Sequence, residues 1–244
     1  MHDALSRRGA IVNLLASVIL LALAASVVLF YSDTILSFFF HNRVLNSIIL
    51  AVFTIGVFYA LVSIMRTQRE FRVLEIARKR FGAGKKDRWI DIESQPQLPK
   101  SQVAERLEIY ALQARNYSPP DPDSHIEKVD LTFGLRSSIT RYVAGLLVFL
   151  GLLGTFIGLL SSIEAITSII GEMNPESGDN IQNFLEKIKT GIQAPLMGMG
   201  IAFSTSIFGL VTSLIMGFLH LQLVSANTRY MSRLEAIDSA IFRP

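Results

Sequence analysis

The sequence predicts an all-α integral membrane protein with four transmembrane helices, two of which are long and extend into the cytoplasm. Half of the 244 residues are hydrophobic and only 18% are charged. The mean hydropathy of +0.42 is above that of an ordinary soluble domain. The charged residues also leave long uncharged runs, and about 20 such residues suffice for a helix to cross the hydrocarbon core of a bilayer.

Residues 1–65 are predicted to form a peripheral hairpin of two membrane spans. The first uncharged run extends over residues 9–32. Its apolar part is longer than the core of a cleavable signal peptide, so we expect an uncleaved helix. The second run extends over residues 44–65. Because the connection at residues 33–43 is short, the two spans must run antiparallel.

The following segment, residues 66–140, is predicted to be a cytoplasmic helical insert. Its first part is rich in arginine and lysine, and the positive-inside rule places such a segment in the cytoplasm. Ser124 and Glu127 fit a capping box that starts a helix running without a break into the third span. Basic residues beside a membrane could also bind anionic lipid or an acidic partner, but a topology signal is the simpler explanation of their presence. The same explanation is simpler than nucleic-acid binding, so we expect no nucleic-acid partner.

Residues 141–228 are predicted to contain the two remaining spans, joined by a short periplasmic loop at residues 164–189. No charged residue occurs in residues 142–163 or in residues 190–228. As a helix, the second run would be ~58 Å long, about twice the hydrocarbon thickness, so it must extend past the membrane. The loop has an acidic excess, which places both chain ends in the cytoplasm. Residues 229–244 are expected to form a C-terminal amphipathic helix there.

Each of these two spans carries a stripe of small residues and hydroxyls at helical spacing. In the third span the stripe consists of Gly151, Thr155, Gly158 and Ser162, with Gly154 at its edge. In the fourth span it consists of Gly198, Ala202, Thr205 and Gly209, with Ser206 beside it. Close helix packing and interhelical hydrogen bonds select such stripes in lipid. From the residues alone, two interpretations stay open: a packing seam, or a pore face lined by hydroxyls.

The two stripes lie in sequence blocks that resemble those of the MotA/TolQ/ExbB proton-channel family. Residues 152–159 read LLGTFIGL and are similar to the family's L-G-L-x-G-T-V-x-G-x block, and residues 202–210 read AFSTSIFGL and are similar to its A-x-x-A-T-x-x-G-L block. The similarity covers about residues 135–225. Together with the segment Gly198-Met199-Gly200, the second block also resembles the branch whose partners carry an OmpA-like peptidoglycan-binding domain.

The resemblance assigns roles to individual residues. A threonine of each family block faces a central pore, and the matching positions are Thr155 and Ser206. Serine replaces the family's threonine at the second position, with Thr205 just before it, so either hydroxyl of this pair could face the pore. The expected proton pathway thus comprises Thr155, Ser206 and Thr205. The small residues expected to pack the pore-facing helices are Gly151, Gly154, Gly158, Ser162, Gly198, Ala202 and Gly209.

The resemblance also implies an assembly and a function. It implies a homopentamer in the bacterial inner membrane, around two copies of a single-span MotB/TolR/ExbD-like or OmpA-domain partner with a transmembrane aspartate. Such a partner would supply the ionisable group that a proton pathway needs, because residues 142–163 and 190–219 contain none. The implied function is that of a proton-channel subunit in a motor that converts proton motive force into rotation or mechanical work.

Other function classes are weighed against this one. A membrane scaffold or solute transporter would carry the same stripes for helix packing alone. An enzyme is not expected, because the four histidines are scattered, cysteine is absent, and no nucleophile, base and acid come together in the sequence. For the same reasons we expect no cofactor and no metal.

Overall fold

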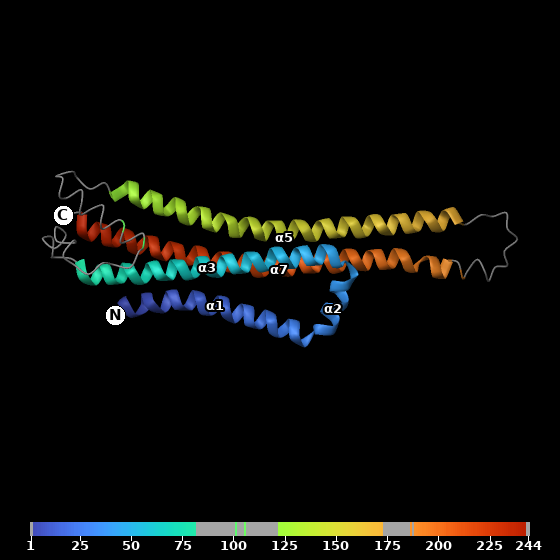
Figure 1. Cartoon of the computed structure of the whole chain (residues 1–244), viewed down its shortest axis with the longest axis horizontal. Helices are drawn as coiled ribbons and strands as arrows, with labels where there is room; N and C mark the ends of the chain where they lie inside the picture. Colours follow the sequence, from blue (N-terminus) through green and yellow to red (C-terminus); the bar gives the residue numbers. More distant parts are fainter. Residues whose placement is uncertain are drawn as a thin grey trace. The chain divides into compact units, whose positions relative to one another are not determined.

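The computed structural model describes residues 2–81, 101, 105, 122–172, 186 and 188–242, and nearly all of them are helical. Five helices contain most of the described residues (Figure 1). They are α1 (His2–Phe30), α2 (Ser32–His41), α3 (Arg43–Phe81), α5 (Pro122–Glu172) and α7 (Gln193–Phe242). The predicted all-α class is therefore confirmed for these residues.

Three helices are long and apolar enough to cross a membrane. Their apolar spans are Arg43–Ile76, Ile126–Gly171 and Ile188–Ala236. A fourth candidate is the pair Leu14–Phe30 and Ser32–His41, which passes the same criteria only when its two bent halves are taken together. The chain is thus a membrane protein with three such helices, or four if the bent pair counts as one span.

The connection between the first two predicted spans is itself a helix. At Tyr31 the backbone leaves helical geometry, with φ −104° and ψ 27°, and α2 continues at 85° to α1. Asp33 in the first turn of α2 favours a helix start, since an acidic side chain interacts well with the helix dipole. The side chain of Asn42 then caps α3 by accepting a hydrogen bond from the Leu45 amide at 3.1 Å.

The two longest helices join segments that the sequence analysis treated separately. α5 runs without a break from Pro122 into the apolar span, as predicted, but it begins two residues before Ser124. Proline suits the first turn of a helix, where its missing N–H costs nothing. α7 likewise continues without a break from the apolar run into the predicted C-terminal helix. Pro195 lies within the first turn of α7, where proline is tolerated.

The chain forms two compact units, and α1, α3, α5 and α7 contribute to both. The first unit consists of Met1–Ile19, Phe58–Thr140 and Phe218–Pro244, and the second consists of Leu20–Val57 and Arg141–Gly217. Most of the predicted loop at residues 164–189, and the part of the predicted insert between residues 82 and 121 apart from Ser101 and Glu105, lie outside the described residues.

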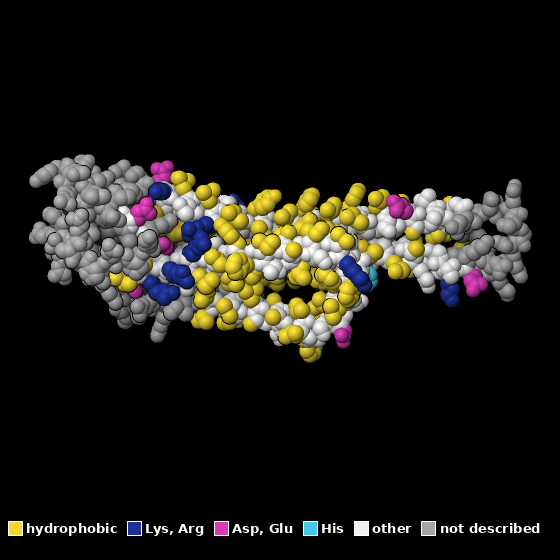
Figure 2. Space-filling view, in the orientation of Figure 1, with side chains coloured by type: hydrophobic (Ala, Val, Ile, Leu, Met, Phe, Trp, Pro, Cys, Tyr) yellow, Lys and Arg dark blue, Asp and Glu magenta, His cyan; other side chains and the backbone are white. Residues whose placement is uncertain are grey.

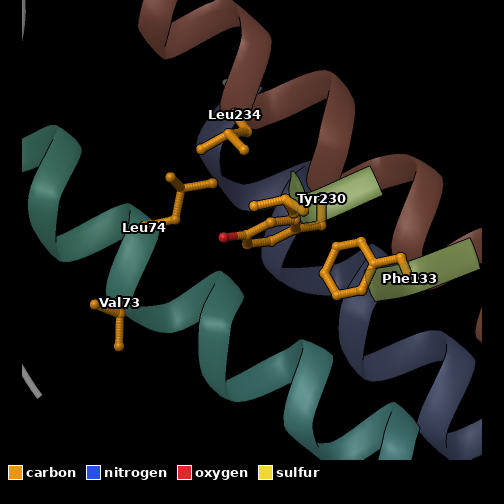
Figure 3. Packing of buried hydrophobic residues seen from close by; sticks show 6 residues of the cluster. Val73, Leu74, Phe133, Tyr230 and Leu234 are labelled. Atoms are coloured by element: carbon orange, nitrogen blue, oxygen red, sulfur yellow. The ribbon is translucent and has the colours of Figure 1, made fainter. Parts of the chain in front are cut away.

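A core of buried apolar side chains holds the first unit together. Tyr230 of α7 is fully buried, and its ring lies 5.2 Å from that of Phe133 on α5, edge to face (Figure 3). The whole cluster consists of Val73, Leu74, Val129, Phe133, Tyr230 and Leu234. The predicted apolar face of the C-terminal segment is therefore buried at Tyr230 and Leu234, while the side chains of Ile237 and Ile241 lie outside the described part.

Two polar contacts accompany this core. The hydroxyl of Thr67 donates a hydrogen bond of 3.0 Å to the side-chain oxygen of Asn227, and the hydroxyl of Thr140 lies 2.8 Å from Nδ1 of His220. Buried polar groups need such partners in order to avoid the cost of desolvation. Each contact links α7 to another helix of the unit.

Candidate functional site

In the second unit, the two small-residue stripes face each other. Gly151 of α5 lies against Gly209 of α7, Gly154 lies against Thr205, and Gly158 lies against Ala202. The residue numbers rise along α5 as they fall along α7, so the two helices run antiparallel. We call this contact the α5–α7 seam.

The seam is close enough that glycine is required on both sides. A Cβ atom added to Gly209 would lie 2.6 Å from the Cα atom of Gly151. One added to Gly158 would lie 2.6 Å from the backbone nitrogen of Ala202 and 2.7 Å from the carbonyl oxygen of Gly198. These obstacles are backbone atoms, which cannot move aside as a side chain can. The glycines therefore bring the two helix backbones into direct contact, as small residues do in membrane helices.

Serine hydroxyls join the two helices at both ends of the seam. The Ser162 hydroxyl of α5 lies 3.0 Å from the carbonyl oxygen of Pro195 on α7 and 2.9 Å from that of Gly158 on its own helix, so its one proton is shared between the two. Ser213 of α7 donates to the carbonyl oxygen of Ala144 at 2.8 Å. At each end of the seam a serine hydroxyl thus reaches a backbone oxygen of the other helix. The predicted packing residues Gly151, Gly154, Gly158, Ser162, Gly198, Ala202 and Gly209 all lie in this seam.

The structure places the two hydroxyls of the pair Thr205 and Ser206 in different surroundings. Thr205 is fully buried, and its methyl group fills the space beside Gly154. Its hydroxyl has no hydrogen-bond partner among the described residues. Ser206 is half-buried, with its backbone against Gly151. Thr205 is thus enclosed within the chain, whereas Ser206 is accessible from outside it.

Thr155 lies beside the seam. The sequence stripe included it and left Gly154 at the edge, but Gly154 is buried in the seam and Thr155 is only half-buried. One residue along a helix corresponds to a rotation of about 100°, so Thr155 is turned away from the contact that Gly154 makes. The repeat of four and three residues alone could not determine where the centre of the contact lies.

Thr155 and Ser206 lie on the same flank of the seam. Leu45 of α3 packs beside Gly154, where its methyl carbon lies 3.1 Å from the position of an added Cβ, and the ring of Phe39 on α2 lies 6.2 Å from that of Phe208 on α7. Phe208 is three residues after Thr205 and is therefore turned back by about 60°, so α2 and α3 cover that flank. Because α5 and α7 are antiparallel, one step forward from Gly154 and one step forward from Thr205 turn both helices toward the opposite flank. Along the helix axes, Thr155 and Ser206 are therefore offset by less than about one helical turn.

The hydroxyl of Thr155 keeps hydrogen-bonding capacity for a ligand. It donates its proton to the carbonyl oxygen of Leu152 at 2.6 Å, within its own helix. A hydroxyl has two acceptor lone pairs in addition to its donor. Thr155 can therefore accept a hydrogen bond from an acid, and it can donate one to a carboxylate once its proton turns away from Leu152.

The apolar depth of the seam contains no charged side chain. Glu164 lies beyond one end and Arg141 beyond the other. Among the described residues, no group of three or more histidines, cysteines or acidic residues could hold a metal ion. His220 lies in the first unit, beside Thr140. Sequence reasoning missed Leu45 and Ala144, since neither a packing leucine nor an accepting carbonyl has a sequence signature.

Comparison of the chain with family models, with curated proteins and with solved structures finds no match.

Proposed function

We propose that the chain is the channel-forming subunit of an ion-driven motor in the inner membrane, with the proton as the ion. The proposal rests on the difference between the packed glycines and the accessible hydroxyls along the α5–α7 seam. Packing within one subunit accounts for every glycine of the two stripes. It leaves Thr155 and Ser206 half-buried on one flank, at a depth without charge. A hydroxyl pair in that position suits a polar group that comes from another chain.

The group that best fits this flank is a carboxylic acid. Protons cross an apolar layer by binding to an ionisable group and leaving it, and the α5–α7 seam offers none. Hydroxyls can hydrogen-bond to both the protonated and the ionised form of an acid. In a homopentamer, five pairs of Thr155 and Ser206 would surround the aspartate of a single-span partner, and its protonation and release would turn the ring in steps.

The proposed topology follows from the same arrangement. Counting the bent pair of α1 and α2 as one span gives four spans, and an even number returns the chain to the side on which it began. The basic residues that follow Met65 then place both ends in the cytoplasm.

A scaffold or solute transporter is the second candidate, and one observation favours it. The seam closes within a single subunit, so the glycine stripes are explained without any pore. A scaffold of this kind needs no partner helix and tolerates the loss of the half-buried hydroxyls.

Purification from native membranes in a mild detergent separates the two candidates. The motor requires a co-purified small protein with one transmembrane helix and an aspartate within it. The scaffold requires none. Reconstitution of the chain with that partner in liposomes then permits proton uptake to be measured directly.

The matched variants for proton uptake are the double substitution Thr155→Val with Ser206→Ala, and the single substitution Thr205→Val. Hydrogen bonds to a charged group contribute about 1.5–3 kcal/mol each, so the double variant should lose at least about tenfold in rate. The Thr205→Val variant, which changes a hydroxyl enclosed in the seam, should keep the rate. Equal rates in the double variant and the wild type would rule out the proposed pathway.

A further inference from the structure

The second half of α1, together with α2, is unusually open. No residue from Leu21 to His41 is buried, and the next fully enclosed side chains are those of Leu45 and Asn46 on α3. Figure 2 shows an opening through the surface of this part of the chain, between α1 and α3, with α2 at one end. We call it the α1–α3 opening. It lies within the unit that contains Leu20–Val57.

The rim of the α1–α3 opening is apolar. Residues 9–32 and residues 44–65 contain no charged side chain, and the side chains around the opening in Figure 2 are mostly hydrophobic. Exposed side chains on the two helices include Leu23, Val27, Val44, Ile48 and Ile55. At this depth the surroundings are hydrocarbon, and an empty space would deprive the atoms on both sides of dispersion contacts. Something apolar must therefore fill it.

The width of the opening fits a hydrocarbon chain better than a helix. α2 has ten residues, so it separates the axes of α1 and α3 by about 15 Å. The two helices, each about 10 Å across with side chains, take up roughly 10 Å of that distance. The remaining ~5 Å accommodates one methylene chain at carbon contact distances of about 4 Å. A further helix would need twice that space.

A single cation stands at the end of this opening. Arg43 is the only lysine or arginine between Arg8 and Arg66, and it begins α3 where α2 ends. Its guanidinium carbon lies 4.7 Å from the centre of the Phe40 ring. Within the described part of the chain it makes no ion pair. Stacking on a ring leaves the N–H edge of a guanidinium available, and that edge matches the oxygens of a phosphate.

We propose that the α1–α3 opening is a phospholipid site. One acyl chain lies between α1 and α3, and the phosphate of the same lipid binds Arg43 at the level of α2, in the membrane leaflet on that side. Apolar surface and a lone cation at the interface are the two features that recognise a phospholipid. This site is independent of the motor function proposed above.

Native mass spectrometry of the purified chain tests the proposal. The probe is palmitoyl-oleoyl phosphatidylglycerol added to the detergent-solubilised protein, and the readout is the amount of lipid that stays bound. Arg43→Gln should reduce retention about fivefold, the size expected for one charge-assisted contact at a partly exposed site. Arg43→Lys, which keeps the charge without the planar fork, should retain an intermediate amount.

Arg66→Gln is the matched control, because Arg66 is also exposed on α3 but lies in the other unit. It should retain as much lipid as the wild type, and all variants should unfold at the same temperature in lipid-free detergent. Equal retention by Arg43→Gln and Arg66→Gln would overturn the proposal.

The proposal would also be overturned if a second copy of the chain occupied the α1–α3 opening. Because the protein has no cysteine, the variant Val27→Cys with Ile48→Cys can be oxidised in the membrane. Under the proposal it gives no covalent dimer. Efficient dimer formation would mean that a neighbouring chain, not a lipid, fills the opening.

Discussion

At the residue scale, the structure separates two neighbouring hydroxyls that the sequence could not rank. Thr205 is enclosed beside Gly154, whereas Ser206 stays half-buried. The sequence indicated a hydroxyl-bearing face from the spacing alone. It could not say which hydroxyl the facing helix covers, because a rotation of about 100° between adjacent residues is decided by the partner helix. The Thr205 side chain packs through its methyl group, and burial of its hydroxyl oxygen, unbonded within the described part of the chain, lowers stability.

Replacing the buried Thr205 hydroxyl should therefore not lower the free energy of unfolding. Thr205→Val keeps the methyl group that packs on Gly154 and removes an oxygen that has no hydrogen-bond partner among the described residues. Removing such an unsatisfied group should leave stability unchanged or raise it by about 1 kcal/mol. Thermal unfolding in detergent measures the effect. A drop of the unfolding temperature would mean that the Thr205 hydroxyl has a partner.

Enlarging the glycine opposite Thr205 should have the reverse effect. The added methyl group of Gly154→Ala would collide with the Thr205 side chain, and overpacking of this kind costs about 1–3 kcal/mol. Gly145→Ala on the same helix is the control, because nothing lies within 4 Å of its added Cβ. It should be neutral or stabilising by up to about 1 kcal/mol.

A double variant isolates the contact. Gly154→Ala combined with Thr205→Ser, which lacks the methyl group, should recover part of the lost stability. If the two effects simply add, then Thr205 does not pack against Gly154.

At the element scale, α5 and α7 were predicted more completely than α1 and α2. Long uncharged runs identify α5 and α7 directly, because a run of that length indicates a helix that crosses a membrane. The helix that joins α1 to α3 has only ten residues, and the sequence analysis treated it only as a short connection. Its direction depends on the bend at Tyr31 and on Asn46, whose amide donates to the carbonyl oxygens of Phe38 and Phe39 at 3.3 and 3.1 Å. No periodicity encodes such contacts.

The two hydrogen bonds at the ends of the α5–α7 seam should each stabilise the helix pair modestly. Ser162→Ala and Ser213→Ala each remove an interhelical donor, and such bonds in membrane proteins average about 0.6 kcal/mol. Ser168→Ala is the control, because the Ser168 hydroxyl bonds only to the Ala165 carbonyl of its own helix. Unfolding by denaturing detergent should distinguish the first two variants from the third. Equal stability in all three would show that the bonds contribute nothing.

Substitutions in the core of the first unit should lower stability much more than loss of the serine hydrogen bonds does. Phe133 is nearly fully buried against Tyr230, and Phe133→Ala should cost about 3–5 kcal/mol of local stability. Hydrogen exchange of the amides around Val73, Phe133 and Tyr230 should accelerate accordingly. Leu135→Ala changes a side chain that is 69% exposed and should leave the exchange rates unchanged. Similar rates in the two variants would contradict the packing of this core.

At the scale of the whole molecule, the all-α class and the long helices follow from where charge is absent. The two units do not follow from the sequence, because their boundaries lie inside continuous helices and no change of sequence character marks them. The candidate site was predictable as a set of small residues and hydroxyls on two spans. Its division into a closed seam and an accessible flank required the antiparallel contact of α5 with α7.

We propose that Ser206, on the flank away from α3, contacts a helix of another protein. Since the chain contains no cysteine, a benzophenone can be attached to a single introduced cysteine and activated by light in native membranes. From Ser206→Cys, we expect a cross-link to a single-span protein with a transmembrane aspartate. The same label on Leu214→Cys, at a side chain that is 76% exposed, should give none. A cross-link pattern that is the same for both positions, or one that contains only lipid, would show that Ser206 does not contact a partner helix.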